Sequence, residues 1–291
     1  MRTAFSYLGG KSRLAPWIAS LLPSHRTYVE PFAGSAAVLF AKPPSKTEIL
    51  NDLDGHVVNF FAVLRDQAPA LIRALRLTPY ARAEFDAADL DEPDLSDLER
   101  ARRFFVRVLG SVSHSTTGTG FAIAPQSPPG GGGADHSRKF AAVVDRLDAC
   151  AERLRRVIIE CKPAVQVIER FGADPHAAMY VDPPYLADVR SMRTKKPGGD
   201  YGVEYFSADE HRQLAEVLAS ARAAVLLSGY DSPLYDALYA GWCRLERQVD
   251  VSMSSGIGRP MKRAVEVVWS NRPLREQGTL DFAEAPTLLE A

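Results

Sequence analysis

The feature that most constrains the fold is an apolar run that leads into Asp182-Pro183-Pro184-Tyr185. Residues 178–181 read Ala-Met-Tyr-Val, which is typical of a strand buried on both faces of a parallel sheet. An acid, two prolines and an aromatic ring therefore follow a strand end, where open α/β sheets bind their ligands. A carboxylate, a peptide carbonyl and a ring can hold a planar amino group. The same residues also suit a simple turn that ends the strand.

Strand-like and helix-like segments alternate on both sides of this run. The predicted strands are short apolar runs at residues 27–29, 47–50, 157–160, 178–181 and 223–228, followed by a terminal hairpin at 245–253 and 264–271. The predicted helices of the first part carry apolar residues at helical spacing and occupy residues 12–22, 36–41 and 57–77. This alternation predicts an α/β fold with a mainly parallel sheet.

Residues 78–156 interrupt the alternation. Their two ends are charged and helical in pattern, whereas residues 110–137 are rich in Gly, Ser, Thr and Pro, as a long loop would be. Such loops are usually functional or disordered. We therefore predict an α/β domain made of residues 1–77 and 157–275, an inserted module of helices and loop at 78–156, and an acidic tail at 276–291.

Composition narrows the class of protein. The net charge of -1 gives the whole molecule no basic field, so any contact with nucleic acid must use a local patch. The three cysteines are far apart and odd in number, which favours a reduced, cytoplasmic protein over a disulfide scaffold. We expect no metal site, no membrane span and no signal peptide, because the sequence shows neither ligand spacing nor a long apolar run.

A second motif, Glu30-Pro31-Phe32-Ala33-Gly34-Ser35, joins a predicted strand to a predicted helix. Gly34 would let the backbone approach a ligand, and the helix start offers free N–H groups. Asp52 ends the next strand 18 residues after Gly34, near the spacing of the acid that accepts ribose hydroxyls in nucleoside-binding folds. The glycines do not follow the dinucleotide pattern, so a nucleoside cofactor without phosphates fits better. Taken alone, the glycine turn is an ordinary connection.

The N-terminal segment Tyr7-Leu8-Gly9-Gly10-Lys11 precedes the first predicted helix. Two glycines and a lysine at a helix N-terminus suit a carboxylate ligand. The Walker pattern is absent, which argues against a nucleotide phosphate. An ordinary turn with a solvated Lys11 accounts for the residues equally well.

In this order the motifs resemble those of the S-adenosylmethionine-dependent DNA adenine-N6 methyltransferases of the deoxyadenosine methylase (D12-type) family. The matching segments are residues 9–11, 30–35, 51–54 and 180–185, with further similar segments at 205–214, 225–230 and 266–271. The resemblance covers residues 5–75 and 157–271. It implies a Rossmann-like methyltransferase sheet with helices on both faces, and a target-recognition module in the insert.

The resemblance also implies a role for individual residues, with S-adenosylmethionine as the cofactor. The catalytic set that would hold the target adenine is Asp182, Pro183, Pro184 and Tyr185. The cofactor set is Tyr7, Gly9, Gly10, Lys11, Glu30, Pro31, Phe32, Gly34, Asp52, Glu160 and Asp182. Within it, Lys11 would lie along the methionine part and Asp52 would bind the ribose.

One position departs from the family pattern. The family usually has an acid near the end of the third strand, where it contacts the adenine of the cofactor. Here the sequence reads Cys161-Lys162-Pro163, with Glu160 just before it. Either Glu160 substitutes for that acid, or backbone groups near Lys162 do.

The expected substrate is double-stranded DNA, from which the target adenine must flip out before it can react. The candidate DNA-binding residues lie after Tyr185 or in the insert: Arg190, Arg193, Lys195, Lys196, Arg103 and Arg107. Runs of charge are more often solvated faces than binding sites. The resemblance also implies, as a partner, a cognate restriction endonuclease that acts independently. We expect the protein to be a monomer or weak dimer.

Three other functions remain open on the sequence. A cytosine-N4 or glutamine amino methyltransferase uses a related tetrapeptide, usually with Ser or Asn in the first place, so Asp182 favours adenine. A catalytically idle DNA-binding subunit is a second alternative. A small-molecule methyltransferase is a third, but it would need neither the insert nor the basic loops.

Overall fold

The computed structural model describes residues 1–7, 9–117, 120–123, 136–184, 207–251 and 262–274. Within them a seven-stranded sheet runs in the order β3-β2-β1-β4-β5-β7-β6. The strands are β1 (Thr27–Glu30), β2 (Thr47–Asn51), β3 (Val157–Glu160), β4 (Ala177–Val181), β5 (Ala224–Gly229), β6 (Cys243–Val251) and β7 (Lys262–Ser270). The predicted α/β fold and its terminal hairpin are confirmed.

The direction of the strands fixes where a ligand can bind. Strands β1 to β5 pair in parallel, and β7 pairs antiparallel with both β5 and β6. The chain moves from β1 outward to β2 and β3, then returns to the other side of β1 with β4 and β5. The strand order therefore reverses between β1 and β4. In open α/β sheets, the crevice at such a point, beyond the carboxyl ends of the strands, is the usual ligand site.

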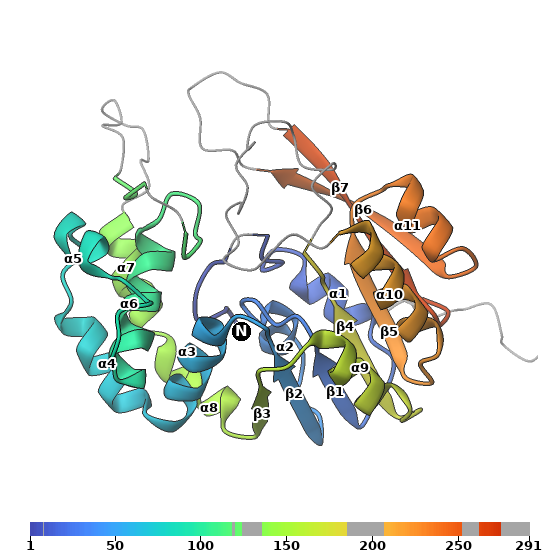
Figure 1. Cartoon of the computed structure of the whole chain (residues 1–291), viewed down its shortest axis with the longest axis horizontal. Helices are drawn as coiled ribbons and strands as arrows, with labels where there is room; N and C mark the ends of the chain where they lie inside the picture. Colours follow the sequence, from blue (N-terminus) through green and yellow to red (C-terminus); the bar gives the residue numbers. More distant parts are fainter. Residues whose placement is uncertain (8, 118–119, 124–135, 185–206, 252–261, 275–291) are drawn as a thin grey trace, which may run out of the picture.

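Helices cover both faces of the sheet (Figure 1). Against one face pack α1 (Ala15–Leu21), α2 (Ala37–Ala41) and α3 (Gly55–Asp66), and against the other pack α9 (Ala164–Gly172), α10 (Ala208–Ala219) and α11 (Pro233–Leu238). Neighbouring strand residues alternate between the two cores, as a pleated sheet requires: Tyr180 and Leu226 join the first, Met179 and Val225 the second. The expected Rossmann-like arrangement, with helices on both faces, is confirmed.

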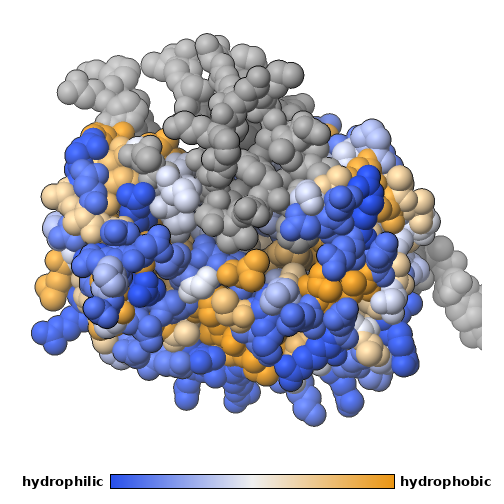
Figure 2. All heavy atoms as spheres, in the orientation of Figure 1, coloured by the Kyte–Doolittle hydropathy of each residue, from blue (hydrophilic) through white to orange (hydrophobic). Residues whose placement is uncertain are grey.

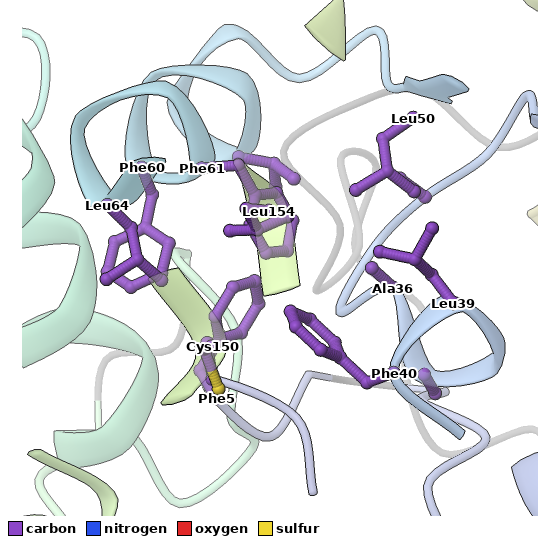
Figure 3. Packing of buried hydrophobic residues seen from close by; sticks show 14 of the residues in the cluster. Phe5, Ala36, Leu39, Phe40, Leu50, Phe60, Phe61, Leu64, Cys150 and Leu154 are labelled. Carbon is purple, nitrogen blue, oxygen red and sulfur yellow. The ribbon is translucent and has the colours of Figure 1, made fainter. Parts of the chain in front are cut away.

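The inserted module shares its core with the α/β domain. It holds α5 (Arg82–Ala87), α6 (Asp97–Gly110), α7 (His136–Val144) and α8 (Leu147–Leu154), beside α4 (Ala68–Leu77). Phe104 of α6 packs on Phe5 and Phe60, with ring centroids 5.2 Å and 5.4 Å apart. Figure 3 shows Phe5, Phe60 and Phe61 converging with Cys150 and Leu154 of α8 in one cluster. The inserted module and the α/β domain therefore share one hydrophobic core.

Several predicted helices are shorter or divided. The helix predicted at 57–77 breaks at Gln67 into α3 and α4, because Pro69 suits only the first turn of a helix. Ser96 accepts a hydrogen bond from the Glu99 N–H and starts α6 afresh. Part of the predicted loop at 110–137 is ordered by an antiparallel bridge between Ser111 and Phe121. No helix in the described part of the chain is long and apolar enough to span a membrane.

Candidate active site

A pocket of about 290 Å³ opens where the strand order reverses, beyond the carboxyl ends of β1 and β4. Most of the predicted site residues line it: Tyr7, Gly9, Gly10, Lys11, Glu30, Pro31, Phe32, Gly34, Asp52, Asp182, Pro183 and Pro184. Tyr185 lies outside the described residues, as do Arg190, Arg193, Lys195 and Lys196. The sequence therefore predicted the position of the pocket and half of the residues that line it.

The Gly34 turn is held by the acid predicted to accompany it. Gly34 has a φ of +46°, a left-handed conformation that favours glycine. Its N–H donates to Asp52 Oδ2 at 2.8 Å, and the N–H of Asp54 donates to Asp52 Oδ1 at 3.0 Å. Burial raises the pKa of Asp52 to about 6, against these hydrogen bonds. The backbone N–H of Leu53 also donates to this carboxylate, so part of its acceptor capacity remains for a ligand hydroxyl.

Asn51 joins three loops at the base of the pocket. Its Nδ2 donates to the carbonyls of Pro31 and Lys162, each at 2.9 Å, and its Oδ1 accepts the Lys162 N–H at 2.9 Å. Asn51 is 1% exposed, so these bonds are shielded from water. The loops that follow β1, β2 and β3 are thereby fixed to one another.

The N-terminal segment forms another wall. The Gly10 N–H donates to the Tyr7 carbonyl at 2.9 Å, and a Cβ at Gly10 would lie 2.8 Å from that oxygen, so a larger residue would force the turn open. The Tyr7 hydroxyl donates to Asp54 Oδ2 at 3.3 Å. Asp54 Oδ1 accepts the His56 N–H and caps α3. The turn before Lys11 is thus tied to the start of α3.

Glu30 lies at the end of β1 and is 1% exposed. Its Oε1 accepts the Tyr28 hydroxyl at 2.7 Å and the Leu39 N–H at 2.6 Å. Burial raises the pKa of Glu30 to about 8. Glu30 therefore reaches the pocket wall, but one of its oxygens already holds α2 in place.

Lys11 joins the pocket to a second buried acid. Its Nζ lies 3.1 Å from Asp182 Oδ1 and 3.4 Å from Glu266 Oε1, and it also donates to the Gly9 carbonyl at 3.3 Å. The Lys11 side chain is 7% exposed. Burial opposes its charge, but the two carboxylates outweigh burial and raise the pKa of Lys11 well above its usual range. The ammonium predicted to hold a cofactor carboxylate is thus directed at Asp182 and Glu266.

The third strand does not bring Glu160 to the pocket. Its carboxylate pairs with Lys162 Nζ at 2.5 Å and with Arg170 Nη1 at 3.3 Å. The backbone N–H and carbonyl of Lys162 are bonded to Asn51. The pocket wall here is the start of α9, at Ala164 and Val165, whose amides have no acceptor within the helix.

Arg103 and Arg107 of α6, predicted to contact DNA, are engaged within the inserted module. Arg103 pairs with Glu92 and, at 3.0 Å, with Glu99. The Arg107 guanidinium lies 4.4 Å from the ring centroid of Phe85 and donates to the Thr116 carbonyl. Hydrophilic residues cover much of the left side of Figure 2, where this module lies.

Sequence reasoning missed the residues that support the pocket from behind. Asn51 carried a signal, since it stands beside Asp52 at a strand end. Glu266 carried another, since it is a charged residue within an apolar strand and is 3% exposed. The start of α9 agrees with the second alternative that the sequence left open, backbone groups near Lys162.

Comparison with known proteins shows the family to which this chain is similar. The model of the D12 class N6 adenine-specific DNA methyltransferases matches residues 7–253. The Type II methyltransferase M1.LlaDCHI of Lactococcus lactis subsp. cremoris is 25% identical over 254 residues, which are 82% of this chain and 84% of that protein. The DNA N-6-adenine-methyltransferase of Escherichia phage P1 is 34% identical over 71 residues, 24% of this chain and 9% of that protein.

Solved structures resemble the chain only distantly. Precorrin 8W decarboxylase from Methanobacterium thermoautotrophicum gives a TM-score of 0.38 at 8% identity, over 93% of this chain and 98% of that chain. A SAM-dependent methyltransferase from Agrobacterium tumefaciens gives 0.36 at 9% identity, over 90% of this chain and 61% of that chain.

Proposed function

Because this chain belongs to the D12 class N6 adenine-specific DNA methyltransferases, we propose that Asp182 and its neighbours methylate an adenine flipped out of double-stranded DNA. The enzyme transfers a methyl group from S-adenosylmethionine to the N6 amine of adenine in DNA. The family match favours this activity over the cytosine, glutamine and small-molecule alternatives.

The observation that carries the proposal is the position of Asp182. It follows β4 at the point where the strand order reverses, lines the pocket with Pro183 and Pro184, and has a side chain 18% exposed. Its carboxylate can accept one N–H of the target amine, and the Pro183 carbonyl can accept the other. Both acceptors draw the amine nitrogen toward tetrahedral geometry and localise its lone pair. Positioning and electrostatics of this kind supply most of the acceleration in such a reaction.

The other half of the pocket suits S-adenosylmethionine, which supplies an electrophilic methyl group on a sulfonium. The Gly34 turn lets a ligand approach the backbone, and Asp52 can accept the ribose hydroxyls with its remaining lone pairs. Tyr7, Gly9 and Gly10 form the wall for the methionine part. These donor and acceptor types match a nucleoside with a charged tail and no phosphate.

We assign the adenine ring of the cofactor to the start of α9. Ala164 and Val165 line the pocket and present backbone N–H groups, which can donate to ring nitrogens. Pro163 and Leu53 add apolar contact. In this assignment, backbone N–H groups replace the acid that the family usually has near the end of the third strand. Glu160 is not used, since its oxygens pair with Lys162 and Arg170.

Access to a base inside a duplex requires flipping, and the stacking of that base on Tyr185 stays a prediction of the sequence. Arg103 and Arg107 are held by groups of the module, so we do not rely on them for phosphate contact. The DNA substrate favours a cytoplasmic enzyme, and we propose that it acts as a monomer or weak dimer. By analogy with the Lactococcus Type II methyltransferase, we propose a setting with an independent restriction endonuclease.

One experiment tests the proposal. The purified protein and tritiated S-adenosylmethionine are incubated with duplex DNA, single-stranded DNA, RNA or free nucleosides, and methylated bases are identified by mass spectrometry. We expect N6-methyladenine in duplex DNA at one sequence context, with transfer that weakens steeply as salt rises. Transfer to nucleosides or RNA in preference to duplex DNA would contradict the proposed substrate.

A further inference from the structure

We infer that Glu266 is a positioning residue for methyl transfer, which holds Lys11 so that Asp182 keeps its capacity to accept the target amine. This inference rests on the proposed role of Asp182. Glu266 belongs to β7 and is not among the residues that line the pocket. It can therefore act on the reaction through Lys11, and through the direct repulsion between its carboxylate and that of Asp182.

The geometry is that of one cation between two anions. Lys11 Nζ lies 3.1 Å from Asp182 Oδ1 and 3.4 Å from Glu266 Oε1, and the two carboxylates are 18% and 4% exposed. Water screens such a group poorly, so the position of the ammonium decides how much negative charge each carboxylate retains. With Glu266 charged, Lys11 is shared between the two acids. With Glu266 neutral, Lys11 is drawn to Asp182 alone and competes there with the amine.

The surroundings of Glu266 favour this shared arrangement. Ser228 of β5 donates a hydrogen bond to it and in turn accepts the Tyr180 hydroxyl at 3.0 Å. Arg247 stands opposite Glu266 in the β6–β7 register, but its guanidinium lies over the Trp17 ring, 5.1 Å from the centroid. The Tyr235 hydroxyl, on the α11 side, hydrogen-bonds to His211 Nδ1 at 3.2 Å. Among these groups, Lys11 is the cation that contacts Glu266.

The arrangement gives methyl transfer a sensitivity to pH near neutrality. Burial raises the pKa of Glu266 to about 7, with Lys11 opposing the shift and Asp182 adding to it. As pH falls through this value, Glu266 is protonated, Lys11 moves toward Asp182, and transfer slows. As pH rises, the shared arrangement returns. A purely structural Glu266 would affect the stability of the protein and leave this dependence unchanged.

The test is single-turnover methyl transfer to unmethylated duplex DNA from pH 6 to 8.5, using the full-length protein and labelled S-adenosylmethionine. We expect Glu266→Gln to slow transfer about tenfold at pH 8 and to remove the rise near pH 7, with cofactor affinity within about twofold of wild type. Glu266→Asp should keep the pH rise at an intermediate rate. Should the Gln variant not fold, the rate and pH profile of Glu266→Asp decide the question.

Glu48→Gln is the matched control, because Glu48 is another buried carboxylate paired with a lysine, away from the pocket lining. It should lower thermal stability and leave the rate and pH profile of the folded enzyme unchanged. A wild-type rate and pH profile in both Glu266 variants, or a loss of stability alone, would overturn the inference. If Asp182→Ala transferred methyl normally, the proposed function would itself fail. If that variant is inactive while the Glu266 variants match wild type, only the role of Glu266 fails.

Discussion

Two buried clusters of acids and bases differ in one respect, the balance of charge. Beside β2, the Glu48 carboxylate receives Lys42 at 2.6 Å, Arg153 at 2.8 Å and the Ser45 N–H at 3.0 Å. Behind the pocket, Asp182 and Glu266 share Lys11. The first cluster has cations in excess of its acid, and the second has acids in excess of its cation.

The pKa values follow this balance. Burial acts on Glu48 as on any buried acid, but hydrogen bonds from Arg153 and Lys42 outweigh it and lower the pKa of Glu48. Burial raises the pKa of Glu266 to about 7, although Lys11 opposes the shift. Where cations outnumber carboxylates, as around Glu48, the ion pairs stabilise the fold. Where carboxylates outnumber cations, as around Lys11, a carboxylate oxygen such as that of Asp182 can still accept a hydrogen bond from the substrate. Keeping these acids charged and buried lowers the stability of the folded protein, as is common at active sites.

The largest effect should come from Asp182. We expect Asp182→Ala to reduce methyl transfer at least about 1000-fold, since it removes an acceptor that acts on the reacting amine. Cofactor affinity should stay nearly intact, because the Gly34 turn and Asp52 are unchanged. Single-turnover transfer and calorimetric titration with S-adenosylmethionine measure the two quantities. Normal turnover in this variant would contradict the view that the Lys11 cluster serves the reaction while the Glu48 cluster serves stability.

The opposite pattern is expected for Glu48. Glu48→Gln leaves Lys42 and Arg153 buried without their carboxylate, and we expect a loss of about 3 kcal/mol in the free energy of unfolding. Urea denaturation measures this loss. The rate of transfer at 25 °C should equal that of wild type. A slower rate in the folded protein would show that Glu48 also supports the reaction.

The pH dependence of stability should separate Glu48 from the acids that line or support the pocket. Glu30, Glu266 and Asp52 have pKa values raised above those of the unfolded chain, so the folded protein holds protons that the unfolded chain has lost. Stability should therefore fall as pH rises from about 5 to 8, with Glu30, whose pKa is raised furthest, contributing the largest share. The lowered pKa of Glu48 acts in the opposite sense, below about pH 4.5. Thermal melts should show a flatter profile for Glu30→Gln, and an unchanged profile would refute the assignment.

The smallest effect concerns Asp52. We expect Asp52→Asn to weaken cofactor binding about tenfold, because the amide loses charge and one acceptor while it can still accept the Gly34 N–H. Calorimetry measures the affinity. Glu160→Gln is the control, since Glu160 does not line the pocket, and its affinity should stay within about twofold of wild type. Equal losses in both variants would place Glu160 back among the cofactor contacts.

The sequence predicted those features that depend on local pattern. Apolar runs identify buried parallel strands, and the interval from Gly34 to Asp52 places both at one edge of the sheet. Glu266 could not be predicted, because it meets Lys11 across 255 residues and that pairing depends on the strand order. The pairing of Arg103 was in fact visible, since Glu99 precedes it by four residues on a helix. The contact of Arg103 and Arg107 with DNA stays a prediction of the sequence.

The contact of Phe104 with Phe5 and Phe60 bears on any exchange of the inserted module, which we propose as the part that recognises the target sequence. An exchange of residues 78–156 between relatives would transplant half of an aromatic cluster and leave the other half behind. Chimeric enzymes would fail through mismatched ring packing before any difference in base reading could be observed. A productive graft must therefore carry Phe5 and Phe60 along with the module, or keep the inward face of α6 and replace only its outward residues and loops.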